Sequence, residues 1–128
     1  MQTNYFDLTG HNLTGINLIE ASAGTGKTYT ITGLFLRLLL EKELSVRDIL
    51  VVTFTEAATE ELKDRIRKGI SGLLDALKYD EVKDNFQQDY IPRIKDRTHA
   101  IKLLKEALIN FDEANIFTIH SFCRRMLN

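Results

Sequence analysis

The sequence predicts an α/β fold in which a parallel sheet is flanked by helices. Short apolar runs typical of buried strands occur at 16–19, 49–54 and 116–119, and longer segments with apolar residues at helical spacing lie between them. Strands that alternate with helices indicate a parallel sheet, because each parallel connection needs a crossover that a helix usually provides. The 128 residues are 44% hydrophobic and 27% charged, which is ordinary for a soluble domain and excludes a disordered or membrane-spanning chain.

The first half of the chain reads as strand, loop, helix, strand and helix. The run at 16–19 leads into a glycine-bearing loop, and from Lys27 apolar residues recur at helical spacing: Ile31, Leu34, Phe35, Leu38 and Leu39. The run at 49–54 is rich in β-branched residues and predicts a fully buried strand of a parallel sheet. Thr55 can cap the next helix, and Glu56 suits its positive end. One face of that helix carries Leu62, Ile66, Ile70, Leu73 and Leu77.

The second half begins with a polar stretch. Residues 79–97 contain the only proline, Pro92, and read as a linker or a poorly packed helical segment. A second amphipathic helix begins with Ile101, Leu104 and Leu108. The run at 116–119 predicts a third strand, and a short helix follows it through Met126.

Charge and cysteine content add little about function but suggest a compartment. Residues 1–64 carry five basic and nine acidic side chains, whereas residues 65–128 carry twelve and nine; solvated helix faces produce asymmetries of this size. The single cysteine, Cys123, forms neither an internal disulfide nor a multi-cysteine zinc site. No basic leader segment is visible at the start. We therefore expect a protein of the reducing cytoplasm.

The most informative segment is a phosphate-binding loop between the first strand and the first helix. Its residues match the pattern G-x-x-x-x-G-K-[ST] with alanine at the first position: Ala21, Ser22, Ala23, Gly24, Thr25, Gly26, Lys27 and Thr28. Small residues let consecutive N–H groups surround a phosphate at the positive end of a helix. Lys27 then supplies a charge between the β- and γ-phosphates, and the Thr28 hydroxyl can ligate Mg²⁺.

Two other interpretations of this loop are weaker. A chance glycine-rich turn would not need both a buried strand before it and an amphipathic helix after it. A dinucleotide-binding loop would need a third glycine where Tyr29 stands, and it would not carry a lysine.

Polar and aromatic side chains follow the second and third strands. Because open α/β sheets bind ligands at the carboxyl ends of their strands, these side chains are candidates for contact with a sugar–phosphate backbone and with unpaired bases. They are Thr53, Phe54 and Thr55 after one strand, and Thr118, His120 and Ser121 after the other. The alternative is core packing for each phenylalanine and a satisfied, partly buried imidazole for His120.

Three further features favour structural roles. Asp112-Glu113 resembles a metal-binding acidic pair, but it follows a helical pattern and reads better as a solvated element boundary. The cluster Lys63, Arg65, Arg67 and Lys68 contains i, i+4 pairs with carboxylates and predicts an ion-paired surface. Cys123 has no base at motif spacing and reads as a buried structural thiol.

The loop and the two strand ends together resemble the motifs of superfamily 1 DNA helicases of the UvrD/Rep type. The closest resemblance is to the RecB family, the beta subunits of exodeoxyribonuclease V. Three segments carry it, namely 18–28 (motif I), 51–58 (motif Ia) and 117–127 (motif Ib). The likeness extends over nearly the whole chain, and the three motifs in this order are specific to the family, whereas motif I alone indicates only a nucleoside triphosphatase.

The resemblance implies a RecA-like P-loop fold, with residues 1–128 as the N-terminal part of helicase domain 1A and 79–111 as a helical or linker insertion. It implies ATP and Mg²⁺ as cofactors, with Lys27 and Thr28 as catalytic residues that hold phosphate and magnesium. The six polar and aromatic residues at the strand ends would face single-stranded DNA. Rep-type helicases carry an upstream glutamine that reads adenine; none matches here, and Tyr5 or Phe6 is the candidate for stacking on the base.

Family members continue well beyond this length, with an Asp-Glu pair, an arginine finger from a second RecA-like domain and usually a nuclease domain. We therefore expect an excised or truncated piece of a bacterial cytoplasmic enzyme of DNA recombination and repair, which binds ATP but does not hydrolyse it appreciably alone. Its partners would be those domains, the other subunits of an exonuclease V-like complex, and single-stranded or duplex-end DNA. Two alternatives stay open: a small P-loop kinase using Arg93 and Arg97, and a non-catalytic module that binds single-stranded DNA or a partner subunit.

Overall fold

The chain folds as a small parallel sheet packed against helices. The computed structural model describes residues 25–127, and side chains from Tyr29 onward. The described elements are α1 (Thr25–Glu41), η1 (Val46–Asp48), β1 (Leu50–Thr53), α2 (Glu56–Tyr79), α3 (Asn85–Tyr90), η2 (Ile91–Arg93), α4 (Arg97–Ile109), η3 (Phe111–Glu113), β2 (Asn115–Thr118) and α5 (Ile119–Leu127). The strand expected at 16–19 lies outside the described residues. The predicted α/β class is confirmed by the described part of the chain.

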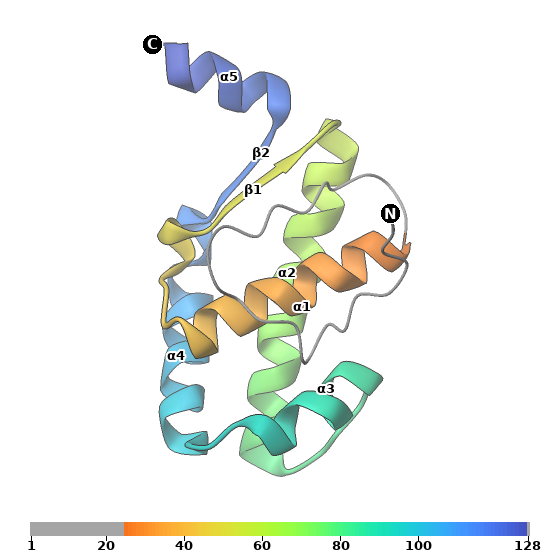
Figure 1. The fold of residues 1–128 in the computed structure, drawn as a ribbon, viewed down its shortest axis with the longest axis vertical. Helices are drawn as coiled ribbons and strands as arrows, with labels where there is room; N and C mark the ends of the chain where they lie inside the picture. Colours follow the sequence, from red (N-terminus) through yellow and green to blue (C-terminus); the bar gives the residue numbers. More distant parts are fainter. Residues whose placement is uncertain (1–24, 128) are drawn as a thin grey trace, which may run out of the picture.

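The two described strands pair in parallel, with Leu50 opposite Asn115 and Thr53 opposite Thr118. A parallel pair cannot be joined by a tight turn, so the chain crosses from β1 to β2 through α2, α3 and α4. Figure 1 shows α1 crossing α2, with α4 beside them and α5 extending away from the helices beyond the end of β2. Both predicted strands and all four predicted helices in this region are therefore present, although Ile119 starts α5 rather than ending β2.

The core lies where α1, α2 and α4 meet. The side chains of Ile66, Ile70 and Leu73 on α2 and of Leu104 on α4 are 0% exposed, and Phe35 of α1 packs into the same cluster. These residues are the apolar faces predicted from the helical spacing. Burial of a side chain of this size contributes roughly 1.5–3 kcal/mol, so this layer is the main source of stability.

The expectation of a fully buried strand at 49–54 is wrong in the described structure. Leu50 is 50% exposed, Val51 and Val52 are half-buried, and Thr53 is the only member of β1 that is buried. In the part of the chain that the structure describes, β1 has a neighbouring strand on one side and α2 on one face. The β-branched and apolar residues of this run correctly indicate a strand, whereas the burial of a strand depends on which other elements pack against it.

The polar stretch at 79–97 is also better packed than its composition suggests. It contains α3, whose Phe86 and Tyr90 are buried and stack with ring centroids 5.1 Å apart. Asp84 caps this helix by accepting a hydrogen bond from the Gln87 N–H at 2.8 Å. The assignment of 79–111 as an insertion stays a prediction, but α3 and α4 share one core with α1 and α2.

A partly buried charge network attaches this stretch to α1. The Arg37 guanidinium, 4% exposed, donates two hydrogen bonds to the Glu41 carboxylate, at 2.7 and 3.0 Å. The hydroxyl of Tyr90, the last residue of α3, donates a third hydrogen bond to this carboxylate at 2.8 Å. Burial alone would raise the pKa of Glu41, but the hydrogen bonds from Arg37 and Tyr90 and the charge of Arg37 outweigh it and hold this pKa below 4.5.

Removal of the Tyr90 hydroxyl tests this attachment. We expect Tyr90→Phe to lower the free energy of unfolding by about 1–2 kcal/mol near neutral pH, because the carboxylate loses a charge-assisted hydrogen bond. Tyr79→Phe is the matched control, since Tyr79 is exposed at the end of α2. Urea unfolding followed by circular dichroism measures both.

The same comparison carries a pH dependence. The pKa of Glu41 is lower in the folded chain than in the unfolded chain, where it is about 4.5. The contribution of the ionised carboxylate to the free energy of unfolding is therefore complete above about pH 4.5 and is lost as the pH falls through the folded pKa. The difference in free energy of unfolding between wild type and Tyr90→Phe should therefore become smaller as the pH is lowered from neutral to about pH 3. A difference that stays constant or widens would contradict the assigned network.

Candidate functional site

The first turn of α1 coincides with the second half of the phosphate-binding pattern. The described part of α1 begins at Thr25, and its first four residues are Thr25, Gly26, Lys27 and Thr28, whereas 21–24 lie outside the described residues. No acidic residue stands in this turn. A helix that started inside the motif would direct free backbone N–H groups and its positive end toward the same point, as phosphate binding requires. The roles of Ala21, Ser22, Ala23 and Gly24 and of the four residues in α1 stay predictions.

The second group of candidate residues meets at one edge of the sheet. In the parallel register Thr53 lies opposite Thr118, so the chain after β1 and the chain after β2 leave the sheet at the same edge. Residues more than sixty positions apart in the sequence are thereby brought together. All six residues predicted to face DNA belong to these two exits or to the strand ends.

Two of the six, Thr53 and Thr118, are buried and use their hydroxyls internally. Thr53 Oγ1 is hydrogen-bonded to the Thr55 carbonyl oxygen at 3.2 Å and to the hydroxyl of Thr59 on α2. Thr118 Oγ1 accepts a hydrogen bond from the Ser121 N–H at 3.0 Å, at the start of α5. These contacts link the chain after each strand to residues beside it, and DNA contact by the two threonines stays a prediction.

The other candidates lie nearer the surface. Phe54 is 56% exposed, so the alternative that it packs in the core is wrong. Thr55 is exposed and caps α2, its Oγ1 accepting a hydrogen bond from the Ala58 N–H at 3.0 Å. His120 is exposed, not partly buried, and Ser121 is half-buried. DNA contact by these residues stays a prediction, and the exposed aromatic ring is the feature that favours it most.

Helix α5 adds positive charge to this edge through two arginines that are not among the residues predicted to face DNA. Arg124 and Arg125 make no ion pair within the described part of the chain, and the helix contains no acidic residue. The Arg125 guanidinium lies 4.6 Å from the centre of the half-buried Phe117 ring. The signal was present in the sequence as two adjacent arginines in a segment without carboxylates.

The prediction of a buried Cys123 is wrong. Cys123 is an exposed free thiol, because α5 rests only on the strand ends and none of its described side chains is buried. The short helix expected through Met126 is present as α5. The sequence did not predict how little of this helix packs against the rest of the described chain.

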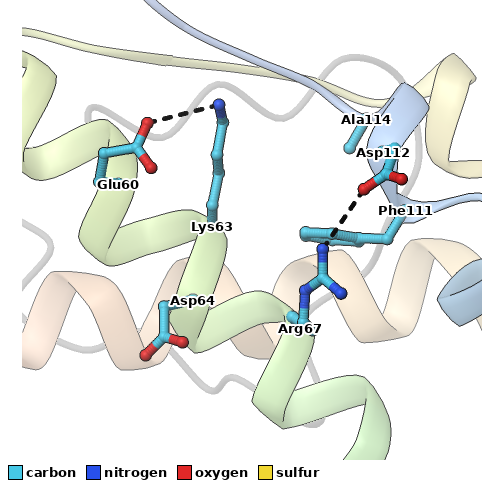
Figure 2. A pocket seen from close by; sticks show the side chains of 7 residues that line it. All are labelled: Glu60, Lys63, Asp64, Arg67, Phe111, Asp112 and Ala114. Carbon is cyan, nitrogen blue, oxygen red and sulfur yellow. Dashed lines mark ion pairs between the residues drawn. The ribbon is translucent and has the colours of Figure 1, made fainter.

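The acidic pair Asp112-Glu113 forms a solvated boundary, as predicted. Asp112 pairs with Arg67 at 3.5 Å, and Glu113 pairs with Arg47 at 2.7 Å. Asp112 and Arg67 line an open cavity of about 320 Å³ between α2 and η3 (Figure 2). The Arg67 guanidinium carbon also lies 5.0 Å from the centre of the Phe111 ring. Among the described residues, no three His, Cys, Asp or Glu side chains are grouped so that they could hold a metal ion.

The basic cluster on α2 is ion-paired, which confirms the prediction made from its spacing. Figure 2 shows Lys63 directed toward Glu60, with Nζ and carboxylate oxygen 3.5 Å apart. Arg65 pairs with Glu61 at 4.0 Å, and Lys68 pairs with Asp64 at 2.9 Å. Their charges are balanced locally, in contrast to the two arginines of α5.

Across residues 25–127 no helix combines the length and apolarity needed to cross a bilayer. Of the two arginines considered for a kinase lid, Arg97 pairs with Asp80 at 3.4 Å, and Arg93 lies exposed in η2.

Comparison with known proteins identifies the class. The model of the UvrD/REP helicase N-terminal domain matches residues 4–128, so the chain belongs to the UvrD/REP helicase family.

Within that family the chain is similar to RecB, the RecBCD enzyme subunit. It is 50% identical over 123 residues to RecB of Buchnera aphidicola subsp. Schizaphis graminum, covering 90% of this chain and 10% of the relative. It is 48% identical over 124 residues to RecB of Escherichia coli, covering 91% and 10%. RecB of Haemophilus influenzae is 50% identical over 129 residues, covering 90% and 11%. The chain thus spans about a tenth of the length of these relatives, and the predicted resemblance to RecB-type helicases is confirmed.

The cap at the exit of β1 provides a test of the local geometry. We expect Thr55→Ala to lower the free energy of unfolding by about 1 kcal/mol, because the Ala58 N–H loses its acceptor. Thr55→Ser keeps the capping oxygen and should retain most of the stability. Thermal and urea unfolding measure both variants; equal losses in the two would show that the methyl group, not the cap, stabilises this exit.

Proposed function

We propose that this chain is the ATP-binding N-terminal segment of an ATP-dependent DNA helicase and exonuclease subunit that acts in recombination and repair. It would bind Mg-ATP through residues 21–28 and single-stranded DNA through the carboxyl ends of β1 and β2. The observation that carries the proposal is the family match over residues 4–128, joined to a parallel register that gathers motifs Ia and Ib at one edge. A RecA-like domain 1A, of which this chain is a part, is the fold that goes with it.

The donor set at the start of α1 suits a nucleoside triphosphate. Lys27 would supply a cation to the β- and γ-phosphates, and Thr28 a hydroxyl ligand to Mg²⁺; bound Mg²⁺ would neutralise charge on the phosphates. The backbone N–H groups of the first helical turn would complete the cradle. That turn carries no carboxylate to repel the phosphates.

The edge formed by β1, β2 and α5 suits single-stranded DNA. Phe54 offers an exposed ring for base stacking, and Thr55 and His120 offer polar groups beside it. Ser121 lies in the first turn of α5, the helix that carries Arg124 and Arg125, whose charges no carboxylate of the described chain neutralises. Thr53 and Thr118 would act by positioning these groups rather than by touching DNA.

Hydrolysis, partners and compartment follow from the same proposal. Phosphoryl transfer requires charge stabilisation on the γ-phosphate, for which an arginine finger contributes a factor of about 10³–10⁵. We expect this chain alone to bind nucleotide without appreciable turnover. It would function in the bacterial cytoplasm with further helicase and nuclease domains, with the other subunits of an exonuclease V-like complex, and with duplex-end DNA.

Nucleotide binding is tested by removing the lysine of the loop. We expect Lys27→Ala to weaken Mg-ADP binding by at least about tenfold, because a charge-assisted contact to phosphate is lost. Lys42→Ala is the matched control: it removes the same charge from an exposed residue just beyond α1. Isothermal titration calorimetry measures both. Equal affinity in Lys27→Ala and wild type would contradict the assignment of the loop.

DNA binding is tested by separating stacking from charge. Phe54→Ala should weaken binding of a labelled single-stranded oligonucleotide by roughly 1–3 kcal/mol at every salt concentration, because one base loses its stacking surface. Arg124→Ala should instead make the dependence of log K on log salt shallower by about 0.7 for each lost phosphate contact. The controls are Tyr79→Ala, an exposed ring at the far end of α2, and Arg93→Ala, an exposed cation in η2.

Two results would overturn the proposal. If the wild-type chain binds no oligonucleotide even at low salt, the edge of the sheet is not a DNA site. If Phe54→Ala and Arg124→Ala behave like their controls, binding occurs elsewhere on the molecule.

A further inference from the structure

The crossing of α1 over α2 depends on a glycine. A β-carbon placed on Gly69 of α2 would lie 2.7 Å from Thr32 Cγ2 and 3.7 Å from Leu36 Cδ1, both on α1. Carbon atoms pack best at about 3.5–4.0 Å, so the first of these contacts is too short for any residue with a side chain. Figure 1 shows the crossing in the centre of the molecule.

The surroundings leave α1 little room to adjust. Thr32 is β-branched and has few χ1 rotamers in a helix, and Leu36 is buried at 3% exposure. On α2 the glycine stands between Ile66 and Ile70, which are fully buried in the same core. Because protein interiors are close-packed, a displacement of α1 by about 1 Å at this point would disturb neighbours on both helices.

The crossing lies close to the predicted phosphate-binding residues. Thr32 stands one helical turn after Thr28, which corresponds to about 6 Å along the helix axis. A shift of α1 at Thr32 is therefore carried to the first turn with little loss, since a helix moves as a rigid body over one turn. The contact with Gly69 is well placed to determine where this turn sits relative to the rest of the molecule.

We propose that Gly69 is a positioning residue for nucleotide binding. Its missing side chain lets α1 lie close enough to α2 to hold the loop residues Lys27 and Thr28 in place for phosphate and Mg²⁺. The proposal rests on the proposed nucleotide site and adds a residue that belongs to none of the three motifs.

The chain offers a matched control three residues away. Gly72 also lies inside α2, but a β-carbon there would lie 3.4 Å from Gln87 Nε2, the end of a longer side chain on α3. Gly→Ala in a helix interior favours the helix to a similar extent at either position. Gly72→Ala therefore reports the gain in helix propensity, whereas Gly69→Ala reports the same gain together with the collision against Thr32.

The experiment measures Mg-ADP affinity by calorimetry in the 128-residue chain, with thermal unfolding as a check of folding. We expect Gly69→Ala to bind on the order of tenfold more weakly than wild type, and Gly72→Ala to bind within about twofold of it. The double variant Gly69→Ala/Thr32→Ser removes the colliding methyl group but keeps the hydroxyl, so it should recover most of the affinity. Wild-type affinity in a folded Gly69→Ala variant would overturn the proposal.

A second measurement separates this proposal from the nucleotide site itself. Amide hydrogen exchange over residues 25–32 without nucleotide should be faster in Gly69→Ala than in wild type or Gly72→Ala, and Thr32→Ser should restore it. If the wild-type chain binds no nucleotide, the proposed function fails, whereas unchanged exchange overturns the role of Gly69. If Gly69→Ala does not fold, the double variant decides: folding with near wild-type affinity supports the proposal, and failure to fold overturns it.

Discussion

Parallel pairing of β1 with β2 is the constraint on which the rest of the structure depends. Parallel strands require a long crossover, and here that crossover supplies α2, α3 and α4, which carry most of the buried core. The same pairing sets Thr53 opposite Thr118 and so brings two distant segments to one edge. The buried core and the candidate DNA surface thus both follow from the parallel pairing of β1 with β2.

Helix α2 connects the two ends of the candidate site. Its N-terminus is capped by Thr55 at the edge where Phe54 is exposed, and its centre crosses α1 at Gly69. Because Leu62 and Ile66 between these points are buried, the helix is held firmly there. A rigid element of this kind allows groups that would bind nucleotide and groups that would bind DNA to keep a constant spacing.

The outlying segments differ in how they are held. The arrangement of Arg37, Glu41 and Tyr90 fastens α3 to α1 through charge-assisted hydrogen bonds, and stacking of Phe86 on Tyr90 adds apolar contact. Helix α5, in contrast, has no buried side chain in the described chain and keeps unpaired arginines at its surface. The polar stretch at 79–97 is therefore packed more closely than its composition suggests, whereas α5 contributes no buried side chain.

The sequence by itself determined the α/β class, the order of the described elements, the capping by Thr55, the ion-paired face of α2 and membership of the helicase family. These features depend on local spacing and residue type, which are present in the chain before it folds. The exposure of Leu50, Phe54 and Cys123, the burial of Thr53 and Thr118, and the fastening of α3 through Tyr90 were decided only by the tertiary structure. So was the need for glycine at position 69. Burial and close approach depend on which distant segment arrives at a surface, and no local pattern records that partner.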